Sequence, residues 1–163
     1  MTRRWPLTAA TLAWAAWLGA ALLTVAVVAP GAFAVLPSRS LAGTMVGRVL
    51  PVVFASGMLI GVAVAALLGV GPGRRVPSIT ALCAAAACAV SHFLVDPKIA
   101  QLRVEIGGPV DALPADDARR VAFGLLHGYS VGGLGVAMLA ATLSLAFVLH
   151  LARPAVAGRA NPN

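Results

Sequence analysis

The residues in this sequence whose side chains are best suited to bind a metal ion or a cofactor are histidines and cysteines within apolar stretches. His92 lies about one helical turn before the end of one such stretch, and His127 lies less than two turns into the next. The chain therefore brings both imidazoles toward the same side of a membrane, where their nitrogens can ligate a metal ion or a b-type haem. Cys88 precedes His92 by one helical turn and adds a soft ligand. This pattern raises the hypothesis of a haem or copper site at His92, His127 and Cys88.

A structural role competes with that hypothesis. Intramembrane histidines also satisfy neighbouring backbone carbonyls, which explains His92 near a loop and His127 against an adjacent helix. Cys83 and Cys88 are five residues apart, about 140° around a helix, so a disulfide between them would break the helix. The structural interpretation is the simpler one, and no cofactor is assigned, with haem or copper as the alternative.

Motifs that carry enzymatic chemistry are absent. The sequence contains no GxSxG, no HExxH and no P-loop. The formal net charge is +7, but the charges occupy only the gaps between apolar segments and form no basic stripe. We therefore expect a protein that is not an enzyme and does not bind nucleic acid.

The elements that must position these residues are membrane helices. The 163 residues are 60% hydrophobic and only 10% charged, with a mean hydropathy of +0.94. A soluble domain carries about 25% charged residues, so a soluble globule is excluded. Four segments without Asp, Glu, Lys or Arg are long enough to cross a bilayer; they span residues 7–29, 52–70, 78–95 and 121–149. The fold class is therefore an all-α membrane protein, a four-transmembrane-helix bundle with short amphipathic helices in the loops. Residues 1–152 form a single domain, and residues 153–163 are a short polar tail.

Prolines and glycines mark the expected breaks in the first half. Pro30-Gly31 ends or bends the first helix, because proline lacks an N–H and clashes with the preceding turn. Residues 38–50 are predicted to form an interfacial helix that turns at Pro51 into the second span. Residues 71–75 form a tight turn, so the second and third spans are antiparallel neighbours.

Caps mark the breaks in the second half. Asp96 is expected to cap a new helix with Pro97 at its first position, followed by a short amphipathic helix that ends at Gly107. Asp116 and Asp117 favour the N-terminus of the helix that continues into the fourth span.

The even number of spans places both termini on one side. Arg3 and Arg4 flank the first span closely, which favours cytoplasmic termini in a bacterial inner (cytoplasmic) membrane. Signal-peptide cleavage at Ala32-Phe33-Ala34 is the alternative for the first span, but its 23 apolar residues exceed the 7–15 of a signal's apolar region.

Small residues recur every four positions in two spans. Such rows let helix backbones approach closely in lipid. Internal contact within one bundle is the preferred interpretation, and a homodimer seam is the alternative. The rows are Gly57, Gly61, Ala65 and Gly69 in the second span, and Gly124, Gly128 and Gly132 in the fourth.

Charged residues gather in the loops opposite the termini. Arg39 and Arg48 could pair with Asp96 and with the acids before the fourth span, which would latch the loops. The basic residues, with Arg103 among them, could instead bind lipid headgroups. The latch is the simpler expectation.

The chain resembles a known family in several runs: Trp17-Leu18-Gly19, residues 28–33 with Leu36, residues 47–51, Asp96 to Ile99 with Leu102-Arg103, and residues 123–130. Over roughly residues 10–150 it is similar to the transmembrane-protein-205-like domain. The resemblance implies a four-helix integral membrane domain of largely unknown function, with a distant likeness to copper-resistance D-type membrane proteins. Matching positions are Pro30, Phe33, Arg48, Pro97, Arg103 and His127. Some relatives carry Asn shortly after the serine that matches Ser130, where this chain has Gly132-Gly133.

Together these features predict an integral membrane protein with a non-enzymatic structural or accessory role. Its partners would be the lipid bilayer and a second copy or another membrane protein. A haem- or copper-binding protein is the alternative, and an oligomeric transporter of a metal or an amphiphile is a further one.

Overall fold

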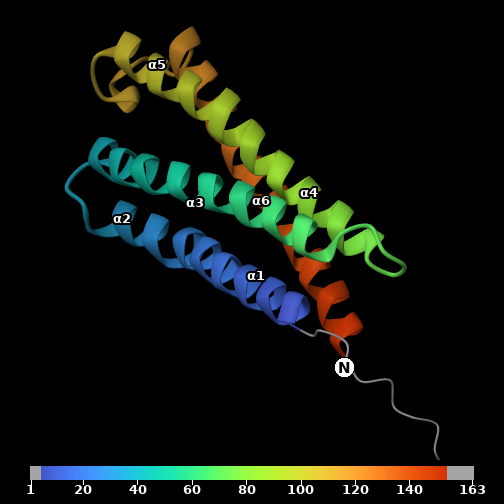
Figure 1. Cartoon of the computed structure of the whole chain (residues 1–163). Helices are drawn as coiled ribbons and strands as arrows, with labels where there is room; N and C mark the ends of the chain where they lie inside the picture. The colour runs from blue at the N-terminus through green and yellow to red at the C-terminus, as the bar shows by residue number, and fades with distance from the viewer. Residues whose placement is uncertain (1–4, 154–163) are drawn as a thin grey trace, which may run out of the picture.

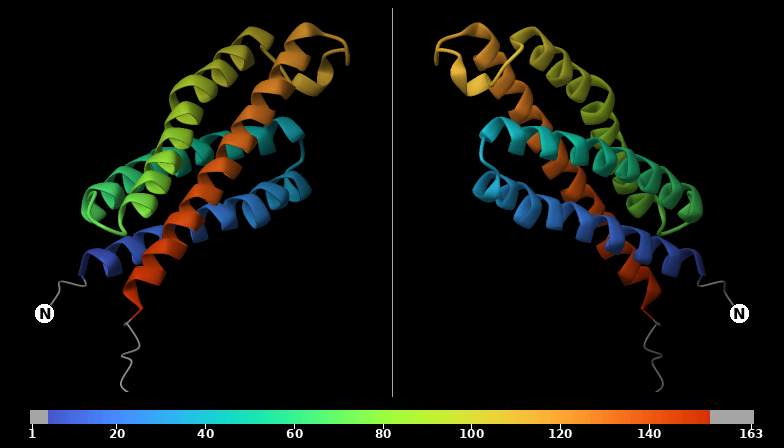
Figure 2. Two further views of the ribbon diagram at one scale, coloured as in Figure 1. Left: turned by 90° about the vertical axis from the view of Figure 1, so that its right-hand side faces the viewer. Right: turned by 90° about the vertical axis from the view of Figure 1, so that its left-hand side faces the viewer.

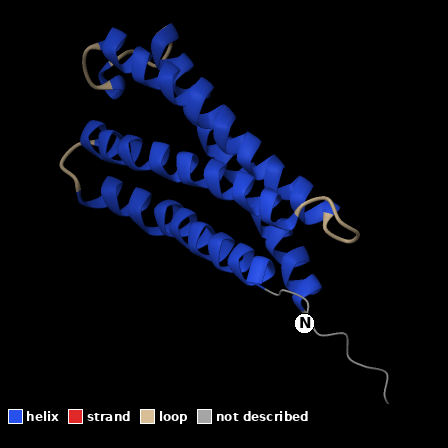
Figure 3. Cartoon of the chain, in the orientation of Figure 1, coloured by secondary structure: helices blue, strands red, loops and turns tan. Residues whose placement is uncertain are grey.

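The computed structural model describes residues 5–153, and these residues are helical apart from short loops (Figure 3). The elements, in chain order, are α1 (Trp5–Leu23), the π-helical turn η1 (Thr24–Val28), α2 (Ala29–Val35), α3 (Arg39–Leu68), α4 (Arg75–Val90), the π-helical turn η2 (Ser91–Val95), α5 (Asp96–Ile106), the 3₁₀ turn η3 (Val110–Ala112) and α6 (Ala118–Ala152).

These elements join into four long apolar rods. Residues Trp5–Val35, Arg39–Leu68, Arg75–Ile106 and Ala118–Ala152 each form a helical unit of 30 to 35 residues that is apolar enough to cross a membrane. Backbone groups in lipid must be paired within the chain, which a helix does and an open strand does not. The predicted four-helix membrane fold is therefore confirmed.

The start of α1 and the end of α6 lie at the same end of the bundle (Figure 1). The turn between α3 and α4 lies at this terminal end too, whereas the α2–α3 and α5–α6 connections lie at the other (Figures 1 and 2). We call the second end the distal end. The predicted tight turn is present, with Gly69 and Gly73 at φ +66° and +74°, so α3 and α4 run antiparallel.

Of the three breaks predicted at prolines, the one at Pro51 is absent, and those at Pro30 and Pro97 take the form of π-helical turns. Pro51 lies inside α3, so the expected interfacial helix and second span are one continuous helix of 30 residues. Pro30 and Pro97 each follow a π-helical turn and sit in the first turn of α2 and α5. In these turns the N–H of Ala29 donates to Thr24, and that of Asp96 to Ser91. The wider π-helical turn accommodates the proline, and the rod continues beyond it.

Of the predicted helix ends, the cap at Asp96 is absent, and those at Gly107 and Asp117 are present. Asp96 is helical, with φ −56° and ψ −44°, so it does not cap a new helix. Gly107 ends α5 in the left-handed conformation, with φ +65°. Asp117 caps α6, because its Oδ1 accepts a hydrogen bond of 2.8 Å from the N–H of Arg119.

The main core fills the terminal half of the bundle. Trp14 and Trp17 from α1 pack edge to face, with ring centroids 5.8 Å apart. Trp14 Nε1 donates to Ser144 Oγ at 3.1 Å, and Ser144 Oγ donates to the carbonyl of Pro77 at 2.8 Å. Trp17 Nε1 donates to the carbonyl of Val53 at 2.9 Å. These bonds tie α1 to α3 and α6, and α6 to α4, so the first span is an integral part of the bundle.

The two rows of small residues have different surroundings. A Cβ at Gly57 would lie 2.6 Å from the Trp17 ring and 2.7 Å from Cys88 Sγ, and one at Gly61 would lie 2.7 Å from the carbonyl oxygen of Ala81. The helices α1, α3 and α4 thus meet at these glycines. Gly69 instead ends α3.

The glycine row of α6 does not make the internal contacts expected of it. A Cβ at Gly124, Gly128 or Gly132 would have no heavy atom within 4 Å. The close approach of α6 to η2 occurs instead at Gly133, against Ser91. The four-residue repeat of glycine therefore follows an open face of α6, one residue away from the face that packs.

Candidate functional site

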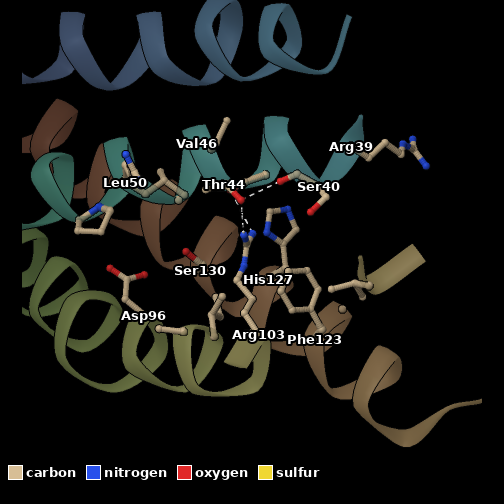
Figure 4. Close-up of a pocket in the computed structure, with 18 of the residues that line it drawn as sticks. Arg39, Ser40, Thr44, Val46, Leu50, Asp96, Arg103, Phe123, His127 and Ser130 are labelled. Atoms are coloured by element: carbon tan, nitrogen blue, oxygen red, sulfur yellow. Dashed lines mark hydrogen bonds between the residues drawn. The ribbon is translucent and has the colours of Figure 1, made fainter. Parts of the chain in front are cut away.

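A cleft of about 1130 Å³ opens at the distal end, between the N-terminal half of α3 on one side and α5 with the N-terminal half of α6 on the other (Figure 4). Its volume slightly exceeds the range of about 300–1,000 Å³ that is usual for small-molecule sites. The main core lies in the terminal half, so the cleft occupies the part of the bundle where the rods are less closely packed.

The inner wall of the cleft includes His92, Asp96 and Ser130, whose unpaired polar atoms are buried. At about 1.5 Å per residue, Asp96 lies about 31 Å along its rod from Arg75, and Ser130 lies about 33 Å from the end of α6 at Ala152. Arg48 lies about 30 Å from Leu68 at the other end of α3. These lengths are close to the thickness of a bilayer's hydrocarbon core, which is about 30 Å.

Arginines from three helices line the cleft. Arg39 and Arg48 come from α3, Arg103 from α5 and Arg120 from α6. Arg39 lies at the outer edge of the cleft, and its guanidinium is directed away from the other labelled residues (Figure 4). Arg120 donates to the carbonyl of Leu113 at 2.7 Å. The acids that line the cleft are Asp96 and Asp111, so the cleft carries a positive excess.

The predicted latch of ion pairs is not formed within residues 5–153. There the acid–base pairs are Arg119 with Asp117 and His92 with Asp96, and neither Arg39 nor Arg48 contacts an acid. The distal end is held instead by Arg103, which donates to the Gly43 carbonyl at 3.1 Å and to Thr44 Oγ1 at 3.3 Å.

Arg103 is the link between α5 and the two neighbouring helices. Besides its bonds to α3, its guanidinium lies over the ring of Phe123 in α6, 5.3 Å from the centroid. A planar guanidinium suits both roles, because its edge donates hydrogen bonds while its face stacks on a ring. Both of its terminal nitrogens, Nη1 and Nη2, thereby donate to the protein.

Three polar atoms on the inner wall lack hydrogen-bond partners. They are His92 Nδ1, Asp96 Oδ2 and Ser130 Oγ, all buried, and all three residues line the cleft. His92 Nδ1 and Asp96 Oδ2 are 3.8 Å apart, which is beyond hydrogen-bond length. Most buried polar atoms in proteins are paired, so three unpaired ones on one wall call for an explanation.

The predicted three-residue metal site is not assembled. His92 and His127 both line the cleft, but Cys88 is fully buried in the main core beside Gly57. In the described part of the chain, no group of three or more His, Cys, Asp or Glu side chains is placed to hold a metal ion. The one-turn spacing of Cys88 and His92 does not bring them to one site because Cys88 points into the helix interface.

Sequence reasoning missed Ser130, Arg120 and Phe123 as residues of the cleft. A serine inside an apolar helix usually bonds to a carbonyl of its own preceding turn, so Ser130 carried no signal. The resemblance of residues 123–130 to a recurrent family segment was the one available hint.

Residues 12–107 match the model of a family described as a domain of unknown function (DUF4149). The match begins within α1, covers the rest of the first rod and the whole of the second and third, and ends before α6, so His127 and Ser130 lie outside it. No curated protein and no solved structure matches the chain. The finer likeness to the transmembrane-protein-205-like domain is not part of this match. Because the matched segment covers well over half of the 163 residues, this multi-pass helical membrane protein belongs to the DUF4149 family.

Proposed function

We propose that the protein is a non-enzymatic accessory component of the membrane that binds the anionic group of an amphiphile in the distal cleft. The observation that carries this proposal is the presence of Arg39 and Arg48 in the cleft with no acid partner in the described structure. Unpaired arginines at headgroup level attract phosphate and carboxylate groups.

The walls of the cleft support an amphiphile rather than a small polar anion. Phe33, Leu50 and Ile99 line it alongside the arginines, and the Phe33 side chain is 48% exposed. An acyl chain would cover such surface, while the headgroup would meet the charged residues. A site of this kind needs neither a catalytic group nor a cofactor, which is consistent with the absence of enzymatic motifs in the sequence.

The proposed location is the inner membrane of a bacterium, with both termini in the cytoplasm and the cleft in the opposite leaflet. The arginines that precede the first span support this orientation. The likeness to the transmembrane-protein-205-like domain is part of the same proposal. Reporter fusions after residue 75 and after residue 110 test the orientation, and an external signal from the first would reverse it.

Binding of a soluble short-chain phosphatidylglycerol to the detergent-solubilised protein tests the main proposal. The double variant Arg39→Gln, Arg48→Gln should bind about 10- to 30-fold more weakly, because each arginine near a headgroup contributes about 1 kcal/mol. The matched control is Arg74→Gln, Arg75→Gln at the terminal end, which should retain the wild-type affinity. Equal affinities for the two double variants would refute the proposal.

A further inference from the structure

The unpaired atoms of the inner wall come from three elements of the bundle: η2 supplies His92, α5 supplies Asp96 and α6 supplies Ser130. Ser130 is only 1% exposed, and its hydroxyl bonds neither to its own helix nor to a neighbour in the described structure. The Asp96 and Ser130 side chains are both directed toward α3 (Figure 4). We call His92, Asp96 and Ser130 the acceptor triad.

We propose that the acceptor triad binds a primary ammonium group, and that the amphiphile of the cleft is a phospholipid with an amine-bearing headgroup. This inference rests on the proposed function, because it assigns the anionic group of the same ligand to the arginines. It adds a second contact, to the cationic end of the headgroup.

The chemistry of the three atoms matches an ammonium group. An ionised carboxylate only accepts hydrogen bonds, a neutral imidazole accepts at its unprotonated nitrogen, and a hydroxyl oxygen accepts through its lone pairs. A primary ammonium carries three N–H donors, one for each of these atoms. The gap of 3.8 Å between His92 Nδ1 and Asp96 Oδ2 lets one donor group approach both atoms.

Charge favours the same ligand. Asp96 is the acid of the triad, and in the described structure no arginine or lysine pairs with it. The nearby Arg103 is already bonded to Gly43 and Thr44. A cationic guest would neutralise the buried carboxylate, whereas a phosphate placed at the triad would be repelled by it. The anion therefore belongs with Arg39 and Arg48, and the ammonium with Asp96.

The level of the triad favours a lipid as the source of the amine. Asp96 and Ser130 lie about 31 and 33 Å along their rods from the terminal end, close to the hydrocarbon thickness. Phe33, Leu50 and Ile99 line the same cleft and offer apolar surface to acyl chains. A soluble amine would leave that surface uncovered.

The experiment compares four ligands by calorimetric titration of the detergent-solubilised full-length protein. These are short-chain phosphatidylethanolamine, phosphatidylcholine and phosphatidylglycerol, and soluble phosphoethanolamine. Phosphatidylethanolamine should bind at least tenfold more tightly than phosphatidylcholine, whose quaternary ammonium has no N–H donor, and also more tightly than phosphatidylglycerol and phosphoethanolamine. Equal affinity for the ethanolamine and choline lipids would overturn the inference, and equal affinity for phosphoethanolamine would overturn the lipid source.

Variants separate this inference from the proposed function. Asp96→Asn and Ser130→Ala should each lose most of the preference for phosphatidylethanolamine over phosphatidylcholine and keep their binding of phosphatidylglycerol. Asp111→Asn, at the second acid that lines the cleft, is the matched control and should keep the preference. Ser130→Ala removes only one oxygen and decides the question if Asp96→Asn fails to fold. An unchanged preference of Ser130→Ala for phosphatidylethanolamine over phosphatidylcholine would refute the role of the triad. If the wild-type protein binds none of the lipids, the proposed function itself is refuted.

Discussion

Gly57 and Gly128 are both glycines within apolar helices, but Gly57 is closely packed and Gly128 is not. A Cβ at Gly57 would meet the Trp17 ring and Cys88 Sγ, whereas one at Gly128 would meet nothing within 4 Å. Gly57→Ala should therefore lower the free energy of unfolding by about 1–3 kcal/mol, because the Trp17 indole must move away from its bond to Val53. Thermal unfolding in detergent, followed by tryptophan fluorescence, measures the effect.

Gly128→Ala is the matched control for that variant. It should leave stability unchanged or raise it by up to about 1 kcal/mol, since alanine favours a helix more than glycine does. Similar destabilisation in both variants would contradict the different packing of the two glycines. If Gly128→Leu dissociates a dimer while the monomer stays folded, the open glycine row is a seam between two copies.

At the scale of elements, the cap of α6 stabilises the helix through local bonds, and this stabilisation depends on pH. Asp117 accepts hydrogen bonds from the N–H and guanidinium of Arg119, and these lower its pKa from 3.8 to about 2. Asp117→Ala should lower Tm by roughly 2–4 °C at pH 7. Because the ionised form makes the bonds, this stabilisation is fully present above about pH 4 and disappears as the pH falls through about 2.

Melting curves of wild type and Asp117→Ala at several pH values from 7 down to about 1 test this prediction. The neighbouring Asp116 makes no capping bond in the described structure, so Asp116→Ala is the control. A difference between wild type and Asp117→Ala that persists below pH 2 would rule out the ionised cap as its cause.

The elements that sequence reasoning placed correctly are those set by composition or by local bonds. The four apolar rods follow from hydropathy and length, and the ends at Gly107 and Asp117 follow from the conformations that glycine and a capping carboxylate favour. The break predicted at Pro51 is absent, and the π-helical turns that precede Pro30 and Pro97 were not part of the prediction. No rule of residue types signals such a turn.

The site was foreseen in outline only. Arg39, Arg48, Asp96 and Arg103 were identified together at one membrane face, and all of them line the cleft. Which charge meets which partner depends on the rotation of each helix about its axis. That rotation also decides that Cys88 enters the core while His92 faces the cleft. Rotation is fixed by packing against other helices, so a single segment does not reveal it.

At the scale of the whole molecule, one arginine ties α5 to both α3 and α6 at the distal end. Arg103 reaches the Gly43 carbonyl and Thr44 on α3 and lies over Phe123 on α6. Arg103→Gln should let α3 and α5 separate, lengthening the distance between spin labels at Leu41 and Val104 by about 1–2 Å or more and broadening its distribution. Both label positions are exposed. Pulsed electron spin resonance on a Cys83→Ala background measures the distance.

Arg119→Gln is the control for this prediction, because within residues 5–153 the hydrogen bonds of the Arg119 side chain go to Asp117 and not to α3. Its distance distribution should match the wild type. An unchanged distribution in Arg103→Gln would show that the rods hold their spacing without the guanidinium.

The bond from Trp14 to Ser144 joins residues that are 130 positions apart. During biosynthesis, the first helix enters the bilayer long before the ribosome has made its hydrogen-bonding partner. The indole N–H of Trp14 gains that partner only when the last helix leaves the translocon and docks, and the Ser144 hydroxyl then also reaches Pro77. Completion of the terminal half of the bundle is thus a post-insertion step. A nascent chain that stops before α6 leaves the Trp14 indole N–H without this partner.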